Sequence, residues 1–327
     1  MQSFSEQYIA HVKSESAAFQ LLNAEIAKVI VGQQDTIPFV LMAILCNGHI
    51  LLEGVPGVAK TTLIKTVSSA LGLSFKRIQF TPDLLPADLI GTLIYNQKTQ
   101  EFETRKGPIF ANLVLADEIN RAPAKVQSAL LEAMQEHQVT IGNNTFKLEE
   151  PFLVFATQNP IEQEGTYRLP EAQVDRFMFK IKVDYPTSAE EKEIIRRVFN
   201  PVSIVKVLTP TAIRTAQELV NQIYVNDKIV DYITAIVFAT RKPEQSKLEK
   251  IASFISYGAS PRATLSLYHA SRAHAFLKGR HFVTPDDVKI VAPAVLRHRI
   301  ALSYEAEAHQ TTGDDIVRAI LAAVPAP

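Results

Sequence analysis

A short segment near residue 55 has the residue types and spacing that bind a triphosphate. Gly54 and Gly57 lie within it, and Lys60 and Thr61 end it. Glycines let backbone N–H groups approach phosphate oxygens, and the N-terminus of a following helix adds positive potential there. We expect Lys60 to reach the β- and γ-phosphates and Thr61 to bind Mg²⁺ through its hydroxyl group. The spacing therefore predicts a phosphate-binding loop.

One position of this loop departs from the usual pattern. Ala59 stands where Gly-Lys-Thr would have its glycine. A methyl group is tolerated there if the residue already has helical dihedral angles, which is our expectation. An ordinary glycine turn between a strand and a helix is the alternative interpretation. The apolar residues before the loop and the Lys-Thr pair after it favour phosphate binding.

Two acidic residues end the apolar segment 112–116. Asp117, at the carboxyl end of a predicted strand, would help to hold Mg²⁺ by way of water. Glu118 would orient and activate the water that attacks the terminal phosphate. A strand followed by an acidic turn is the alternative, and the phosphate loop some sixty residues earlier makes the catalytic interpretation the better one.

The apolar segment 152–157 ends in a similar way, but with uncharged polar residues. Asn159 could donate a hydrogen bond to the γ-phosphate or to the attacking water without adding negative charge. A plain Asn-Pro turn after a strand explains these residues equally well.

Two arginines are placed where an anion would stabilise them. Arg176 comes just before the last predicted strand, and Arg262 is the second residue of a helix whose start is marked by Ser260 and Pro261. The helix dipole opposes a cation at that end, so Arg262 calls for a compensating anion, which a nucleotide phosphate would supply. A surface salt bridge is the alternative for each.

The elements that must position these residues alternate between strand and helix. Such alternation predicts an α/β fold, with a parallel sheet covered by helices on both faces. Two helices come first, near residues 5–30 and 36–46. The predicted strands are 49–53, 75–80, 112–116, 152–157 and 177–183, and the predicted helices between them are 60–71 and 124–137.

Two insertions interrupt this alternation, and both have the pattern of a hairpin. In the first, residues 92–95 and 102–104 flank a polar turn. In the second, apolar residues on either side of Gly142-Asn143-Asn144 predict two short strands.

The pattern changes after residue 186, where the chain becomes almost wholly helical. We therefore expect two domains, an α/β nucleotide-binding domain over 1–186 and a smaller all-α lid domain over 187–327. The helices expected in the second domain are 188–199, 210–223, 227–240, 261–278 and 285–296.

Composition excludes several classes of function. Lys+Arg and Asp+Glu both number 34 among the 327 residues, so the net charge is zero and no basic arm indicates strong nucleic-acid binding. The single cysteine, Cys46, lies in an apolar run and is expected in the core. We find no signal-peptide pattern at the start and no apolar stretch of membrane-spanning length, so we expect a cytoplasmic protein without membrane insertion.

These motifs, in this order, resemble the MoxR family of AAA+ ATPases, within the helix-2-insert clade. The resemblance extends over nearly the whole chain. The segments that carry it are 31–33, 54–61, 79–88, 107–112, 116–121 and 156–160. It implies a nucleotide-binding core with a five-stranded sheet and a helical lid, and it makes the two hairpins the helix-2 insert and the pre-sensor-1 insert of that clade.

The resemblance also implies a role for each motif residue. Those implied to contact ATP are Val31, Gly32, Gly54, Gly57, Val58, Ala59, Lys60, Thr61, Thr62 and Arg262, the last as sensor 2. Those implied to hold Mg²⁺ are Thr61 of Walker A and Asp117 of Walker B. Those implied to take part in hydrolysis are Glu118 of Walker B, Asn159 as sensor 1 and Arg176 as the arginine finger. Because Arg176 precedes the final strand whereas the phosphate loop follows an interior strand, we expect Arg176 to act in trans.

Family members form homo-oligomeric rings, commonly hexamers, and mature or activate partner protein complexes, often with a protein that carries a von Willebrand factor A domain. The resemblance thus implies an ATP-hydrolysing, chaperone-like remodelling enzyme. Three alternatives remain: a nucleic-acid-dependent motor, a nucleotide-gated scaffold with low turnover, and a small-molecule kinase. The neutral charge argues against the motor, Glu118 argues against the scaffold, and a kinase would not need an arginine that acts on a neighbouring copy.

Overall fold

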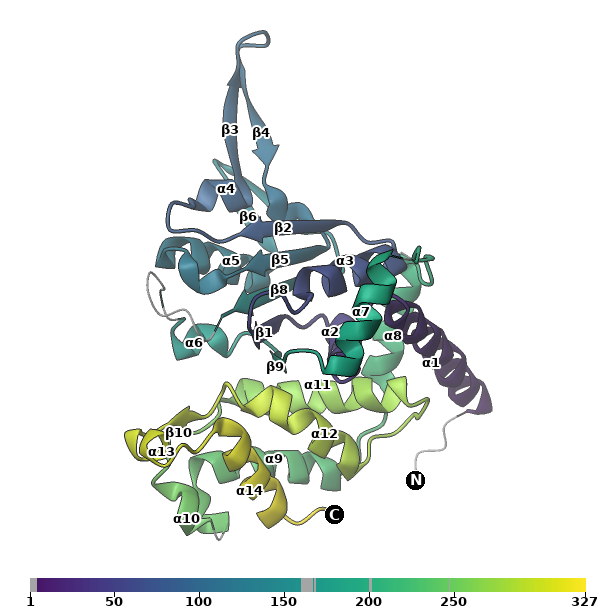
Figure 1. The fold of residues 1–327 in the computed structure, drawn as a ribbon, viewed down its shortest axis with the longest axis vertical. Coiled ribbons are helices and arrows are strands. Elements are labelled where there is room, and N and C mark those ends of the chain that lie inside the picture. The colour runs from purple at the N-terminus through teal and green to yellow at the C-terminus, as the bar shows by residue number, and fades with distance from the viewer. Residues whose placement is uncertain (1–4, 160–166, 168, 200–201, 247) are drawn as a thin grey trace.

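The computed structural model describes residues 5–159, 167, 169–199, 202–246 and 248–327 (Figure 1). Its centre is a five-stranded parallel sheet with the strand order β2-β5-β8-β1-β9. The strands are β1 Ile50–Gly54, β2 Phe75–Gln79, β5 Leu113–Asp117, β8 Leu153–Gln158 and β9 Phe179–Val183. The predicted α/β fold with a parallel sheet is therefore confirmed.

The interior strands are apolar along their length because helices cover both faces of the sheet. Alternate residues of a strand contribute to two different clusters of buried side chains. Leu113 and Leu115 join the cluster that includes α2 (Thr36–Cys46) and α3 (Lys60–Leu71). Val114 and Ala116 join the cluster on the other face, which includes α5 (Ala124–Glu136).

The edge strand β2 differs from the interior strands. Of its five residues, Ile78 is buried, whereas Lys76, Arg77 and Gln79 are exposed. Since side chains alternate between the two faces of a strand, Arg77 and Gln79 lie on the same face. This polar row of β2 lies beside the end of β5.

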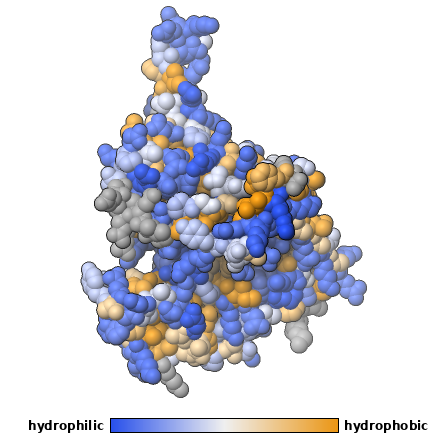
Figure 2. Space-filling model, viewed as in Figure 1, coloured by the Kyte–Doolittle hydropathy of each residue, from blue (hydrophilic) through white to orange (hydrophobic). Residues whose placement is uncertain are grey.

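Both predicted hairpins are present. The first consists of β3 (Gly91–Asn96) and β4 (Glu101–Lys106) and projects far from the body of the molecule (Figure 1). Hydrophobic residues gather part of the way along this projection, below a hydrophilic tip (Figure 2). The second hairpin consists of β6 (Gln138–Ile141) and β7 (Asn144–Lys147), and its turn residue Gly142 packs closely against the side chain of Leu93 in β3.

The C-terminal part is mostly helical, as predicted, but its helices form two groups (Figure 1). Helices α7 (Ser188–Phe199) and α8 (Pro210–Gln222) lie beside the sheet together with α1 (Glu6–Ala27). The second group lies on the side of the sheet away from the projecting hairpin. It consists of α9 Asp227–Arg241, α10 Glu249–Ala252, α11 Pro261–Leu277, α12 Pro285–Leu296, α13 Tyr304–Ala308 and α14 Gly313–Ala323. We refer to this second group as the lid. Buried side chains of α2, α8 and α11 belong to one continuous cluster, so the boundary at residue 187 stays a prediction.

Several short elements complete the fold. They are α4 Pro86–Ile90, α6 Glu171–Val174, β10 Ile255–Tyr257, β11 Ala301–Leu302 and the 3-10 helices Pro108–Phe110, Ile119–Arg121 and Pro243–Ser246. Within the described ranges, every helix is too short or too polar to cross a lipid bilayer.

Candidate nucleotide site

The predicted phosphate loop connects β1 to α3, and its two glycines serve different purposes. A Cβ atom on Gly54 would collide with the carbonyl oxygen of Val183 in the neighbouring strand β9. Gly57 has open space around its Cα, but its φ of +87° is one that other residues rarely adopt. Gly54 is therefore required by close strand packing, and Gly57 by the conformation of the turn.

Ala59 corrects one expectation. Its φ of 58° and ψ of 23° are left-handed, not those of a right-handed helix. It is the residue immediately before α3, and its carbonyl accepts a hydrogen bond from the backbone N–H of Leu63 at 2.9 Å. An alanine in this conformation costs about 1–2 kcal/mol relative to a right-handed one. The loop thus holds a strained backbone at the first turn of the helix.

Lys60 points back along the loop toward the sheet. Its Nζ atom donates a hydrogen bond to the carbonyl oxygen of Gly54. Burial lowers the pKa of Lys60, while the negative charges of Asp117, Glu118 and Glu53 act in the opposite direction. The start of α3 and the end of β5 therefore lie close enough for their charges to interact.

Asp117 receives hydrogen bonds from the strand on each side of β5. From β8, the Thr157 hydroxyl donates to Oδ1 of Asp117 at 2.6 Å. From β2, Arg77 donates to Oδ2 through Nε at 3.0 Å and Nη2 at 2.5 Å. Both donors follow from the strand order, because β5 lies between β2 and β8. Sequence reasoning did not identify either of them.

Glu118 is held by three neighbouring residues. Its backbone N–H donates to the Thr157 hydroxyl at 2.8 Å, and its φ of 56° is left-handed. Its Oε2 atom accepts from Gln79 Nε2 at 2.7 Å and from Arg121 Nη1 at 3.0 Å. The carboxylate that we expect to activate water is therefore oriented by two charge-assisted hydrogen bonds.

Asn159 lies, like these acids, at the carboxyl ends of the strands. It directly follows β8 and is buried. Because the carboxyl ends of parallel strands meet at one edge, the phosphate loop, Asp117, Glu118 and Asn159 are brought together there. Pro160, which ends the segment that includes Asn159, lies outside the described residues.

A cavity of about 700 Å³ opens beside the phosphate loop. The expected nucleotide-contacting residues that line it are Val31, Gly32, Gly57, Val58, Ala59 and Thr62. The cavity is also lined by Tyr185, Ile194 and Val198, in and just before α7, which sequence reasoning missed. Gln33 Nε2 donates to the carbonyl oxygen of Val58 at 2.6 Å and so links the segment 31–33 to the phosphate loop. The cavity combines apolar side chains with the start of a helix.

Arg176 lies near the amino ends of the strands, away from the carboxyl ends where the phosphate loop lies. It precedes β9 by three residues, and Phe179 at the start of β9 pairs with Ile50 at the start of β1. The phosphate loop leaves the other end of β1, about 13 Å away along the strand direction. Arg176 Nη1 donates to the Leu131 carbonyl oxygen at 2.9 Å, and its buried Nε has no hydrogen-bond partner among the described residues.

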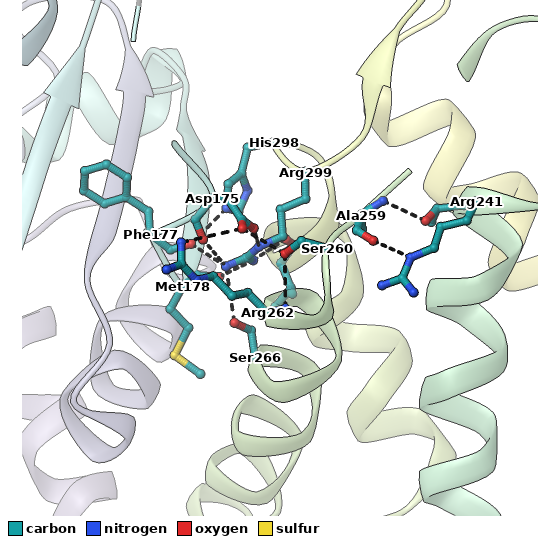
Figure 3. Close-up of polar contacts among 12 residues, drawn as sticks. Asp175, Phe177, Met178, Arg241, Ala259, Ser260, Arg262, Ser266, His298 and Arg299 are labelled. Carbon is teal, nitrogen blue, oxygen red and sulfur yellow. Dashed lines mark hydrogen bonds and ion pairs between the residues drawn. The ribbon is translucent and has the colours of Figure 1, made fainter. Parts of the chain in front are cut away.

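Arg262 lies near Arg176 and not beside Lys60. The two arginines line a second cavity, of about 310 Å³, together with Gly48 and His49, which come just before β1. As expected, Ser260 begins the helix that carries Arg262, since its hydroxyl accepts from the Arg262 backbone N–H at 3.1 Å. The compensating anion within this chain, however, is the carboxylate of Asp175, 3.8 Å from Arg262 Nη1 (Figure 3). Nucleotide binding by Arg262 stays a prediction.

Comparison with known proteins agrees with this arrangement. Residues 49–179 match the model of the ATPase family associated with various cellular activities, and residues 249–320 match that of the AAA lid domain. The chain is 51% identical to Chaperone MoxR1 of Mycobacterium tuberculosis, over 93% of this chain and 81% of that protein. It is 33% identical to Protein MoxR of Methylorubrum extorquens, over 93% of each.

Solved structures give the same result. A crystal structure from Cytophaga hutchinsonii, described as that of a candidate ATPase, superimposes with a TM-score of 0.92 at 49% sequence identity and covers 98% of each chain. Sequence and structure therefore agree over almost the full length of the chain. This protein belongs to the MoxR family of AAA+ ATPases.

Proposed function

We propose that this chain is a ring-forming ATPase that hydrolyses ATP at sites shared between neighbouring copies and uses the energy to remodel a protein client. The observation that carries the proposal is the position of Arg176 and Arg262. Both lie near the amino ends of the strands, whereas the phosphate loop of their own chain follows the carboxyl end of β1. Arginines at the amino ends can meet a terminal phosphate if it belongs to another copy.

Within one copy, the first cavity accommodates the nucleotide. Its apolar wall, with Val31 and Ile194, suits the base, and its other wall leads to the phosphate loop. Backbone N–H groups at the start of α3 would face the phosphates, with Lys60 next to them. Gln33 fixes the distance between the segment that holds the base and the loop that holds the phosphates.

The side chains at the start of α3 and at the end of β5 also fit a magnesium ion. Thr61 and Asp117 offer hydroxyl and carboxylate oxygens, which are the hard ligands that Mg²⁺ prefers. When bound, Mg²⁺ would neutralise charge on the phosphate oxygens. Glu118, held by Gln79 and Arg121, would accept a proton from the attacking water.

The second cavity supplies the other half of the site. Arg176, Arg262 and the buried Arg299 line it, and among the described residues of its lining the carboxylate is that of Asp175, which pairs with Arg262 and Arg299. Three guanidinium groups and one carboxylate leave an excess of positive charge in a concave surface. Such a surface suits the terminal phosphate of a nucleotide bound by a neighbouring copy.

The client role comes from relatives. One similar protein is named as a chaperone. We extend that role to this chain as a homo-oligomeric ring, which we take to be a hexamer, that remodels protein complexes together with a von Willebrand factor A domain partner. A nucleic-acid motor is the weaker candidate, since the chain has no net charge.

Mixing two inactive variants tests the shared site. Lys60→Ala should lose ATP binding, whereas Arg176→Ala should bind a fluorescent ATP analogue normally and hydrolyse ATP about 10³-fold more slowly. In a ring with randomly mixed subunits at equal amounts, about one quarter of the interfaces join an intact loop to an intact arginine. The mixture should therefore regain up to roughly one quarter of wild-type activity.

Subunit exchange must be measured in the same samples, by mass spectrometry of differently tagged variants. Rings that demonstrably contain both variants and yet stay inactive at every ratio would overturn the shared site. The control is the mixture of Arg176→Ala with Arg262→Ala. Both variants keep the phosphate loop and lack an arginine of the second cavity, so no interface in the mixture has both arginines.

A further inference from the structure

A buried arginine of the lid, Arg299, makes several hydrogen bonds to the segment that carries Arg176. Arg299 follows α12, and 8% of its surface is exposed. Its Nε donates to the Asp175 carboxylate at 2.8 Å. Its Nη atoms donate to the carbonyl oxygens of Asp175 at 3.0 Å, Phe177 at 2.7 Å and Met178 at 3.1 Å (Figure 3).

Two more lid residues bind the same segment. His298 Nε2 donates to the Phe177 carbonyl oxygen at 2.9 Å. Burial and the nearby charge of Arg299 lower the pKa of His298, so its imidazole is neutral and Nε2 carries the proton. The Ser260 hydroxyl donates to the other oxygen of Asp175 at 2.8 Å. Residues on both sides of Arg176 are thus bonded to the lid.

The chemistry of these contacts requires an arginine at position 299. A guanidinium has five N–H donors in a rigid plane, whereas an ammonium group has three, so a lysine could not make all four of these hydrogen bonds at once. Burial lowers the pKa of Arg299 to about 10, and the Asp175 carboxylate acts in the opposite direction, so the group is charged at neutral pH. Removing it would leave the Asp175 carboxylate and three carbonyl groups without these donors.

These contacts fix the backbone on both sides of Arg176 with respect to the lid. By contrast, the Arg176 side chain itself contacts the α/β core through the Leu131 carbonyl oxygen. A shift of the lid would therefore move the Cα of Arg176 relative to the helix that its guanidinium touches. Small displacements of a catalytic group of about 1 Å can reduce a rate by about 10²-fold.

We propose that Arg299 is a positioning residue for ATP hydrolysis, and that through it the lid of one copy sets the orientation of Arg176 in the site of the next copy. This inference depends on the shared site proposed above. Arg299 does not itself act on the phosphate in this proposal; it couples the position of the lid to the arginine that does.

Arg299→Met is the first test, with Arg272→Met as its matched control. Arg272 is also a lid arginine with 8% exposure, but its Nε donates to the carbonyl of Ile223, away from residues 175–178. Arg299→Met should lower kcat by about 10²-fold. Its affinity for a fluorescent ATP analogue should stay unchanged, and Arg272→Met should keep a kcat close to wild type.

Complementation shows on which face the defect of Arg299→Met lies. Mixed with Lys60→Ala, which has an intact Arg176, it should regain part of the activity. Mixed with Arg176→Ala, it should regain none, because both variants then lack a working arginine. The opposite pattern, rescue by Arg176→Ala alone, would place the defect at the variant's own nucleotide loop and overturn the inference.

A double variant separates this inference from the shared site. In an Arg176→Ala background, Arg299→Met should cause no further loss of kcat, whereas additive losses would mean that Arg299 acts independently of Arg176. If Arg176→Ala alone keeps full activity, the shared site itself is wrong. If Arg299→Met does not fold, Arg299→Lys replaces it, because the lysine keeps a cation opposite Asp175. A wild-type kcat in folded Arg299→Lys would overturn the inference. A reduced kcat that mixing with Lys60→Ala restores would support it.

Discussion

Arg77 donates two hydrogen bonds to the same carboxylate oxygen of Asp117, from Nε at 3.0 Å and from Nη2 at 2.5 Å. The pair joins the edge strand β2 to the strand that ends in the two acids. Half of the Arg77 side chain is exposed, so water screens the interaction. The guanidinium nevertheless occupies an oxygen that we expect to interact with magnesium or its bound water.

Arg77→Gln should therefore make magnesium binding easier. A partly exposed ion pair contributes about 0.5–1 kcal/mol, so the Mg²⁺ concentration that gives half-maximal ATPase activity should fall about 2- to 5-fold. A magnesium titration at saturating ATP measures this. Arg105→Gln, which removes the same charge from the exposed strand β4, is the control. A higher magnesium requirement in Arg77→Gln would show that Arg77 assists the ion and does not compete with it.

Glu118→Gln should bind ATP as well as the wild type but hydrolyse it at least about 10²-fold more slowly, because an amide cannot accept a proton from water. Gln79 and Arg121 can still donate to the remaining carbonyl oxygen of residue 118, so the local structure should persist. Asp117→Asn should instead change the magnesium dependence. Simultaneous loss of ATP binding and turnover in Glu118→Gln would make Glu118 a structural residue.

Ala59→Gly should stabilise the protein slightly, although glycine destabilises the interior of a helix. Relief of the left-handed alanine contributes about 1–2 kcal/mol, and the greater freedom of glycine in the unfolded chain removes about 0.4–1 kcal/mol. We expect a net gain of about 0.5–1 kcal/mol in the free energy of unfolding, measured by urea denaturation. Ala17→Gly, on an exposed turn of α1, should lose about 1 kcal/mol. Equal losses in both variants would contradict a strained Ala59.

His49 should make the protein less stable in mild acid. Its Nδ1 accepts a hydrogen bond from the Val154 backbone N–H at 3.0 Å, so its Nε2 carries the proton and donates to the Met134 carbonyl oxygen at 3.0 Å. Burial lowers its pKa to about 4 from an ordinary 6.5. The unfolded chain therefore binds the additional proton first, and the stability contribution is fully present above pH 6.5 and falls as the pH drops toward 4.

Between pH 7 and pH 5 this histidine should account for a loss of about 2 kcal/mol. Urea denaturation of the wild type and of His49→Gln at both pH values measures the loss. The variant should be less stable at pH 7 but should lose less on acidification. Identical pH dependence of the two proteins would show that His49 does not titrate between the folded and unfolded states.

Much of the fold could be predicted because the relevant signals are local. Helices α2 and α3 have the predicted bounds, since apolar periodicity ends at Asn47 and Gly72, which adopt left-handed conformations at the two helix ends. Helix α14 was not predicted, although Thr312 and Asp315 form a capping box that is readable in the sequence.

The parts of the site that could not be predicted depend on distant contacts or on backbone conformation. Arg77 and Asp117 are forty residues apart and meet because β2 and β5 are neighbouring strands. Arg299 and Asp175 are separated by 124 residues. The left-handed conformation of Ala59 runs against the preference of its residue type, so it could not be predicted from the residue itself.

The opposite placement of the phosphate loop and Arg176 along one parallel sheet has a consequence for dilute protein. A lone copy has the loop without a facing arginine, so under the shared-site proposal it binds ATP but leaves it intact. Specific activity should then rise steeply with protein concentration until every interface is occupied. A cell that makes few copies would spend almost no ATP on them, and the abundance of the chain would itself act as the switch for its activity.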